Sequence, residues 1–182
     1  MLKTKDDFYD LMKAFIGKSK ENNVQYAEIF FDPQSHMQRG TPFKHIIEGL
    51  SEAIEKEGPT GFPKDHPYAS VPFSGKLIMS FLRDWKVDPS DERKPADPSF
   101  DGLPSAMDVL TAAEPFFGKI VAVGLDNAEV FGEPSLFAPV YEAAKNLGIK
   151  HAVAHAGEEG SADPYVTDAI SMLKVERLDH GV

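Results

Sequence analysis

Five short apolar runs, separated by stretches of helical periodicity, constrain the fold of this 182-residue chain more than any other feature. The runs are rich in β-branched and aromatic residues and cover residues 26–31, 76–82, 120–125, 149–154 and 175–178. Four of them are almost continuously apolar, which is typical of strands buried on both faces of a parallel sheet.

The intervals between these runs, and the segment before the first, carry apolar residues at the three- and four-residue spacing of an amphipathic helix. The stripes run through residues 8–16, 43–54, 136–147 and 166–173, with a weaker helical segment at 104–116. Asp163 followed by Pro164 predicts an N-cap that opens the last helix. Because strands that alternate with helices pair in parallel through crossovers, we predict an α/β fold.

Two proline-rich stretches, 58–75 and 86–104, interrupt this alternation and flank the second run. We expect them to be long loops or insertions, because the α/β pattern resumes unchanged after each. The chain is 42% hydrophobic, enough for a substantial core. Residues 1–182 are therefore predicted to form a single α/β domain.

Composition excludes several classes of function. A net charge of −10 argues against binding to nucleic acids or anionic membranes, both of which require a positive surface. No apolar stretch approaches the roughly 18 residues of a membrane span, and the N-terminus lacks a signal sequence, so we expect a cytoplasmic protein. The absence of cysteine removes disulfides, thiol catalysis and cysteine-ligated zinc sites.

Ionisable or polar residues follow every predicted strand at its carboxyl end, the edge at which parallel α/β proteins bind ligands. These residues are Asp32, Arg83, Asp84, Asp126, Asn127, His155, Glu158, Asp179 and His180. Arg83, Asp84 and Asp179 are, singly, also what an ordinary loop would carry. Asp126 fits a loop cap as well as a site carboxylate.

His155 differs from these because it directly continues an apolar run, where a neutral imidazole needs a partner for each ring nitrogen. Glu158 and His180 complete a set that suits metal-assisted hydrolysis, with a histidine ligand, a proton-transferring carboxylate and a second histidine at the water. A catalytic zinc needs about three protein ligands, and no convincing second histidine pair is present. The predicted site is therefore short of ligands.

These residues resemble the motifs of the metal-dependent adenosine/adenine deaminase family, whose members are (β/α)8 barrels. The similarity covers essentially the whole chain and rests on His155-Ala156-Gly157-Glu158, on Arg177-Leu178-Asp179-His180-Gly181 and on residues 123–129. Residues 27–34 and the short Gly-Leu-Asp-x-x-Glu form at 124–129 are closer to the adenine deaminase branch.

The family pattern is incomplete in this chain. The family's first strand carries a His-x-His pair and its eighth an Asp-Asp pair, and neither occurs here. The resemblance thus implies a partial (β/α)8 TIM-type barrel of about five parallel strands, numbers two to six of eight, in a fragment.

The resemblance also implies a function for the complete enzyme. It would use one zinc ion to convert adenine and water into hypoxanthine and ammonia, with His155 as a metal ligand. Glu158 would transfer the proton, His180 would hold the attacking water and Asp126 would border the purine base. We expect the fragment alone to be inactive, and its unpaired sheet edges to favour self-association.

Three alternatives stay open. The complete protein could act on adenosine instead of the free base. The chain could be a non-catalytic barrel remnant kept as an association module. A flavodoxin-like nucleotide-binding sheet ranks last, because no glycine-rich phosphate loop follows any strand.

Overall fold

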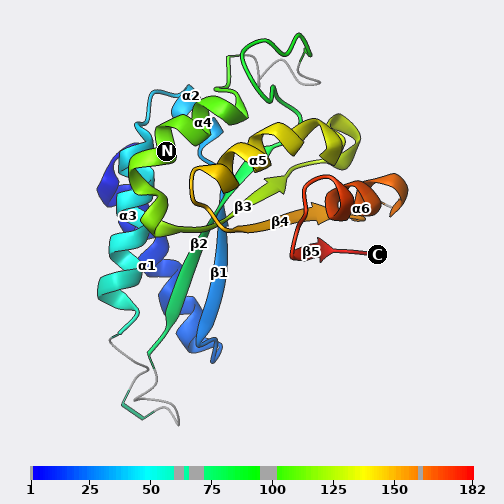
Figure 1. Cartoon of the computed structure of the whole chain (residues 1–182). Coiled ribbons are helices and arrows are strands. Elements are labelled where there is room, and N and C mark those ends of the chain that lie inside the picture. The colour runs from blue at the N-terminus through cyan, green and yellow to red at the C-terminus, as the bar shows by residue number, and fades with distance from the viewer. Residues whose placement is uncertain (1, 60–63, 66–71, 95–101, 160–161) are drawn as a thin grey trace.

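The computed structural model describes residues 2–59, 64–65, 72–94, 102–159 and 162–182, and it shows a curved sheet of five parallel strands (Figure 1). The strands lie in the order of the sequence and form a half-barrel. Their bounds are β1 Tyr26–Phe31, β2 Ser74–Leu82, β3 Ile120–Asp126, β4 His151–Ala156 and β5 Arg177–His180. The predicted α/β architecture and the partial TIM-type barrel are confirmed.

Helices connect the strands and cover the outer face of the sheet. Helix α1 packs against α3 beside β1 and β2, while α5 and α6 lie beside β3, β4 and β5 (Figure 1). The α-helices are α1 Lys5–Glu21, α2 Gln34–Gln38, α3 Phe43–Glu57, α4 Ala106–Ala113, α5 Ala138–Asn146 and α6 Ala162–Ser171. The described residues also form the 3₁₀ segments η2 Glu114–Lys119, η3 Glu129–Phe131 and η4 Pro134–Phe137.

Several boundaries differ from the sequence predictions, most clearly those of β4, β5 and α6. Strands β4 and β5 begin and end two residues later than their apolar runs, so His155, Asp179 and His180 lie within strands. Strand pairing is made by backbone N–H and C=O groups and does not depend on the polarity of the side chains, so polar residues at the rim do not interrupt it. The predicted start of the last helix is also wrong: α6 begins at Ala162, so Asp163 lies inside it. The short helix α2 was not predicted.

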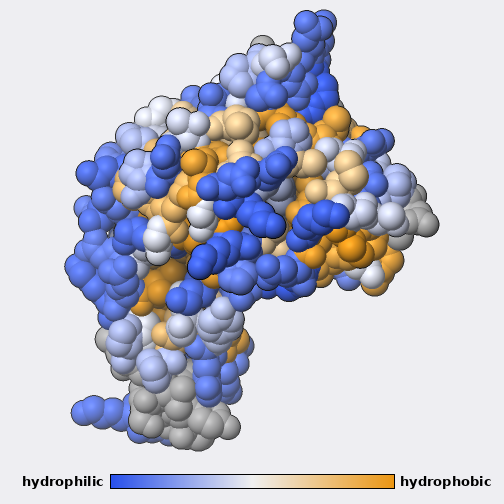
Figure 2. Space-filling model, viewed as in Figure 1, coloured by the Kyte–Doolittle hydropathy of each residue, from blue (hydrophilic) through white to orange (hydrophobic). Residues whose placement is uncertain are grey.

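The two faces of the sheet carry different cores. The larger cluster lies under the helices and includes Ile47 of α3, Phe81 of β2 and Val140 of α5, all 0% exposed. On the concave face a small separate cluster is formed by Ile78, Ala122 and Val153. Polar and apolar residues alternate over the molecular surface (Figure 2). Within the described residues, no helix is long and apolar enough to cross a bilayer.

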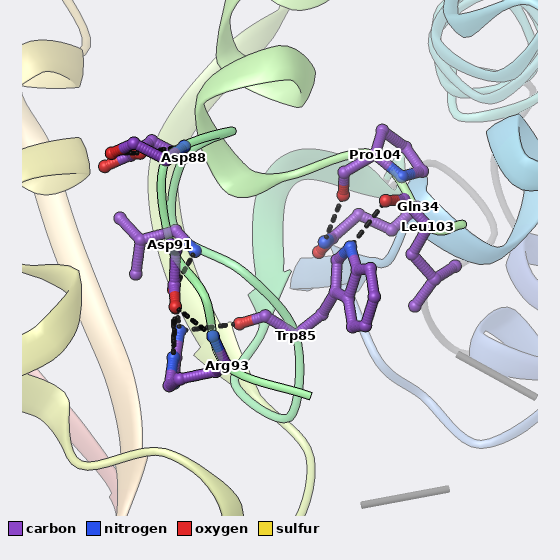
Figure 3. Close-up of polar contacts among 9 residues, drawn as sticks. Gln34, Trp85, Asp88, Asp91, Arg93, Leu103 and Pro104 are labelled. Carbon is purple, nitrogen blue, oxygen red and sulfur yellow. Dashed lines mark hydrogen bonds and ion pairs between the residues drawn. The ribbon is translucent and has the colours of Figure 1, made fainter. Parts of the chain in front are cut away.

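The proline-rich stretches lie partly outside the described residues, which omit 60–63, 66–71 and 95–101. The first stretch was predicted to reach residue 75, but β2 already begins at Ser74. The ends of the second stretch are pinned beside β2 (Figure 3). There the Trp85 indole N–H donates to the carbonyl of Leu103, and Arg93 donates to the carbonyl of Trp85 at 2.8 Å. That residues 1–182 form a single domain stays a prediction.

Gln34 joins three separate segments at the carboxyl end of β2. Its side chain is 0% exposed, accepts a hydrogen bond from the Leu82 N–H at 2.6 Å and donates to the Pro104 carbonyl at 2.9 Å (Figure 3). One buried amide therefore satisfies two backbone groups that no regular strand or helix pairing satisfies.

We predict that Gln34→Ala destabilises the chain, because each buried backbone group left without a partner costs about 1–3 kcal/mol. The free energy of unfolding is measured by urea denaturation. Gln25→Ala is the matched control, since Gln25 is exposed just before β1. Equal stability of the two variants would show that the Gln34 bridge contributes nothing.

Candidate active site

The carboxyl edge of the half-barrel brings together the four residues predicted from the sequence. His155 Nδ1 lies 3.6 Å from Asp126 Oδ1, and the rings of His155 and His180 are 5.3 Å apart between centroids. His180 Nε2 in turn lies 3.5 Å from Glu158 Oε2. Three successive strands, β3, β4 and β5, thus contribute to one cluster of two imidazoles and two carboxylates.

His155 is held with a defined tautomer. Its Nδ1 lies 3.0 Å from the Leu125 carbonyl oxygen, which can only accept a hydrogen bond. In the neutral imidazole this contact places the ring proton on Nδ1 and leaves the lone pair on Nε2. A histidine that donates one ring N–H to a backbone carbonyl is oriented as metal-binding histidines are. The ring also packs against Phe30, with 4.8 Å between centroids.

The backbone around Glu158 and His180 takes conformations that side chains rarely adopt. Gly157 has φ +75°, and a Cβ there would lie 2.7 Å from the Val182 carbonyl oxygen, so the position requires glycine. His180 itself has φ +74°, a left-handed conformation that is uncommon for residues other than glycine. Strain of this kind is concentrated at functional sites. Both positions border the cluster of His155, Glu158 and His180.

Asp32, directly after β1, lies close enough to Asp126 and His155 to interact with both, although its position in the sequence does not distinguish it from other polar residues after the strands. Burial raises its pKa to about 7, with a further upward contribution from the charge of Asp126, while His155 opposes the shift. Its Oδ1 is buried with no hydrogen-bond partner among the described residues. A protonated carboxyl in such a position can donate a hydrogen bond at neutral pH.

The ordinary-loop interpretation of Arg83 is wrong. Its side chain is 0% exposed, and its guanidinium donates to the His155 carbonyl and, at 3.4 Å, to the Gly132 carbonyl. Burial lowers the pKa of Arg83, although the charge of Glu129 opposes that shift. Asp84 is also buried, and it accepts a hydrogen bond from the Asn127 side chain at 2.8 Å.

Asp179 pairs with Arg177 on the same strand, with 3.0 Å between the Arg177 Nε and Asp179 Oδ1 atoms. Arg177 also crosses the concave face to form an ion pair with Glu28 of β1, and it stacks over Phe30 at 5.8 Å. Because β1 and β5 are the two outermost strands, this contact spans the hollow of the half-barrel. It lies below the rim and bounds the candidate site from beneath.

Metal-binding capacity within the described residues is limited. No group of three or more histidines, aspartates or glutamates is placed so that it could hold a metal ion in this part of the chain. His155 nonetheless has the protonation and orientation of a single ligand. The described residues thus fit one part of a metal site.

A parallel half-barrel with imidazoles and carboxylates on its carboxyl rim is the arrangement of an α/β-barrel enzyme. The sequence profile of the family described as Adenosine deaminase matches residues 1–66 and 105–182. The chain belongs to the adenosine deaminase family.

Relatives and solved structures refine this assignment. The adenine deaminase of Cupriavidus pinatubonensis is 41% identical over 182 residues, which are 100% of this chain and 44% of that protein. The crystal structure of an adenine deaminase from Arthrobacter aurescens superposes with a TM-score of 0.80 at 33% identity, covering 100% of this chain and 47% of the other. The chain thus spans less than half the length of these two relatives.

A third similarity shows the fold alone. A zinc-bound amidohydrolase from Burkholderia ambifaria superposes with a TM-score of 0.78 at 22% identity and covers 100% of this chain and 43% of the other. The resemblance to the deaminase family predicted from the sequence is confirmed.

We predict that Asp32 makes stability fall as the pH rises. Its folded-state pKa lies above its unfolded value, so the native state binds more protons between about pH 4 and 7. The stability that Asp32 contributes is complete below about pH 4 and is lost as the pH passes 7, a change of roughly 4 kcal/mol.

Asp32→Asn should remove this pH dependence, because an amide does not titrate. Urea denaturation at intervals from pH 4 to 8 measures the effect, and Asp10→Asn on the exposed face of α1 is the control. A wild-type stability curve with the same slope as the Asn variant would contradict the assignment.

Proposed function

We propose that the complete protein containing this chain hydrolyses the amino group of a purine base, converting adenine and water into hypoxanthine and ammonia. The observation that carries the proposal is the convergence of His155, Glu158 and His180 at the rim, with His155 oriented by the Leu125 carbonyl. Relatives of the chain at about 40% identity carry the name adenine deaminase, which supports the choice of substrate.

We propose that His155 supplies one ligand to a single zinc ion in the complete protein. Its unprotonated Nε2 fits this role, and a structural neighbour of the same fold was crystallised with zinc. When bound, zinc lowers the pKa of a coordinated water to about 7, so that hydroxide forms at neutral pH. The other ligands would come from parts of the complete protein that this chain does not include.

Three residues of the chain would have separate roles in the reaction. Glu158 would deliver a proton to purine N1, which makes C6 electrophilic, and its half-exposed carboxyl is free to face a substrate. His180, within 3.5 Å of Glu158, would hold the water that adds to C6 before ammonia leaves. Asp126, beside His155, would border the purine and accept one of its N–H groups.

Adenine and adenosine must be compared directly to identify the substrate. The complete gene product is assayed with each compound at equal concentration, and ammonia release is measured together with the base product. We expect faster turnover of adenine, because the curated relatives share that name. Faster turnover of adenosine would favour the alternative function, adenosine deamination. Inactivity on both compounds would favour a non-catalytic association module.

We predict that Glu158→Gln in the complete gene product reduces kcat by about 100- to 10,000-fold, the usual contribution of a placed proton-transfer group. The amide keeps the size of the side chain and cannot shuttle a proton. Zinc content, measured by mass spectrometry, should stay unchanged because Glu158 is not a proposed ligand. Glu142→Gln, on the exposed side of α5, is the control. Full turnover in the Glu158 variant would refute the assignment.

We also propose that the 182-residue chain by itself associates with a second copy. Strands β1 and β5 each pair with only one neighbour in the described sheet, which leaves backbone donors and acceptors available on their outer sides. Hydrophobic residues gather over α6 and the end of β5 (Figure 2), where Ile170, Met172 and Val182 are exposed.

Sedimentation velocity over a hundredfold range of concentration tests this association. We predict species larger than the monomer at high concentration, and weaker association for Val182→Lys than for Leu147→Lys, which places the same charge at the distant end of α5. A monomer at every concentration would overturn the proposal.

A further inference from the structure

A buried carboxylate at the end of the segment 123–129 holds the turn that carries Glu158. Glu129, in η3 after β3, is 1% exposed. Its Oε1 accepts a hydrogen bond from the Gly157 N–H at 2.7 Å, and its Oε2 accepts from the N–H groups of Glu158 and Glu159 at 2.8 and 3.0 Å. Three consecutive amides of the β4–α6 loop thus converge on one side chain.

The β4–α6 loop in turn binds the segment that contains Glu129. The carboxylate of Glu159 accepts hydrogen bonds from the backbone N–H groups of Glu129 at 2.9 Å and Val130 at 3.4 Å. Two loops that follow adjacent strands are therefore joined by reciprocal carboxylate-to-amide bonds. We call this arrangement, formed by Glu129, Glu159 and the amides of residues 157–159, the carboxylate clamp.

Arg83 secures the other side of the same segment. Its guanidinium donates to the carbonyl of His155 and contributes an attractive charge to Glu129. Burial alone would raise the pKa of Glu129, but the three amide donors and Arg83 outweigh it and lower that pKa below its usual value. Glu129 therefore stays charged, and its hydrogen bonds are of the strong, charge-assisted kind.

Successive N–H groups that point to one spot normally form a binding site for an external anion. Here the spot is filled by a side chain of the same chain, so no ligand is needed to order the turn. The turn must be ordered because Glu158 is one of the three amide donors. From the backbone position that the clamp fixes, the carboxyl of Glu158 lies 3.5 Å from His180.

We propose that Glu129 is a positioning residue for Glu158, holding it in place for proton transfer without touching the substrate. Arg83 likewise holds the backbone of His155 in place, through its hydrogen bond to the His155 carbonyl. The inference rests on the proposed function for its catalytic consequence, but the clamp itself can be tested without any activity.

The first experiment measures hydrogen exchange of individual amides by NMR in the 182-residue chain. In Glu129→Gln the neutral amide presents to the three N–H groups either its NH₂, which cannot accept a hydrogen bond, or its carbonyl oxygen, which accepts more weakly than a carboxylate. We therefore expect amide exchange at Gly157, Glu158 and Glu159 to be at least about tenfold faster. Amides in the centre of β2 report global stability. Glu133→Gln is the matched control, because Glu133 is exposed in the following loop. Unchanged exchange at the three amides, relative to β2, would disprove the clamp.

The second experiment measures steady-state kinetics of the complete gene product. Loss of a residue that orients a catalytic group typically costs about 10- to 100-fold in activity. We expect Glu129→Gln to lower kcat by this factor with little change in KM, and Glu129→Asp, which keeps the charge, to recover part of the loss. A general loss of structure would instead lower the folded fraction and leave kcat per folded molecule unchanged.

The outcomes separate the two proposals. If the wild-type protein deaminates no purine, the proposed function fails while the exchange experiment still decides the clamp. If the wild type is active and Glu129→Gln retains full kcat, the positioning role is wrong even where exchange is faster.

Discussion

The parallel register of β3, β4 and β5 is the constraint on which the candidate site depends. In the β4–β5 pair, His155 lies opposite Asp179 and Ala156 opposite His180, while β3 pairs with β4 so that Asp126 arrives beside His155. Side chains alternate between the two faces of a strand, so a slip of one residue would turn His155 away from the hollow and under the helices. The outer core prevents that slip, because it requires Ala154 and Ala156 on the helix side, where both are fully buried.

The fold could be predicted from the sequence because its signals are local. Apolar runs and helical stripes repeat along the chain, and only parallel pairing satisfies their alternation. The ends of β4 and β5 could not be placed in the same way. At the rim, polarity of a side chain reflects the hollow that it faces and says nothing about whether its backbone is paired. His155 and His180 are therefore polar residues inside strands, where hydropathy alone predicts that the strands have ended.

Only part of the candidate site can be predicted from the sequence, for a similar reason. His155, Glu158 and His180 stand in motifs that can be read along the chain, whereas Arg83 and Glu129 act through contacts with segments far away in sequence. Glu159 is exposed, yet its carboxylate accepts hydrogen bonds from two amides of the preceding loop. One signal could have suggested Glu129: a glutamate at a fixed short distance after the third predicted strand, inside a segment already assigned to the site.

Two carboxylates at this rim, Asp32 and Glu129, show how different neighbours shift the pKa of a carboxyl in opposite directions. Removal from water disfavours the charged form of both groups. Glu129 meets three N–H donors and the charge of Arg83, which lower its pKa, so it remains an anion suited to holding backbone in place. Asp32 faces Asp126, and one of its buried oxygens has no partner among the described residues, so its pKa rises to about 7. A permanent anion fixes geometry, whereas a group that titrates near neutrality can gain or lose a proton at little cost. The rim thus separates the side chains that hold its shape from those that can exchange protons, and the number of donors around each carboxylate decides which role it takes.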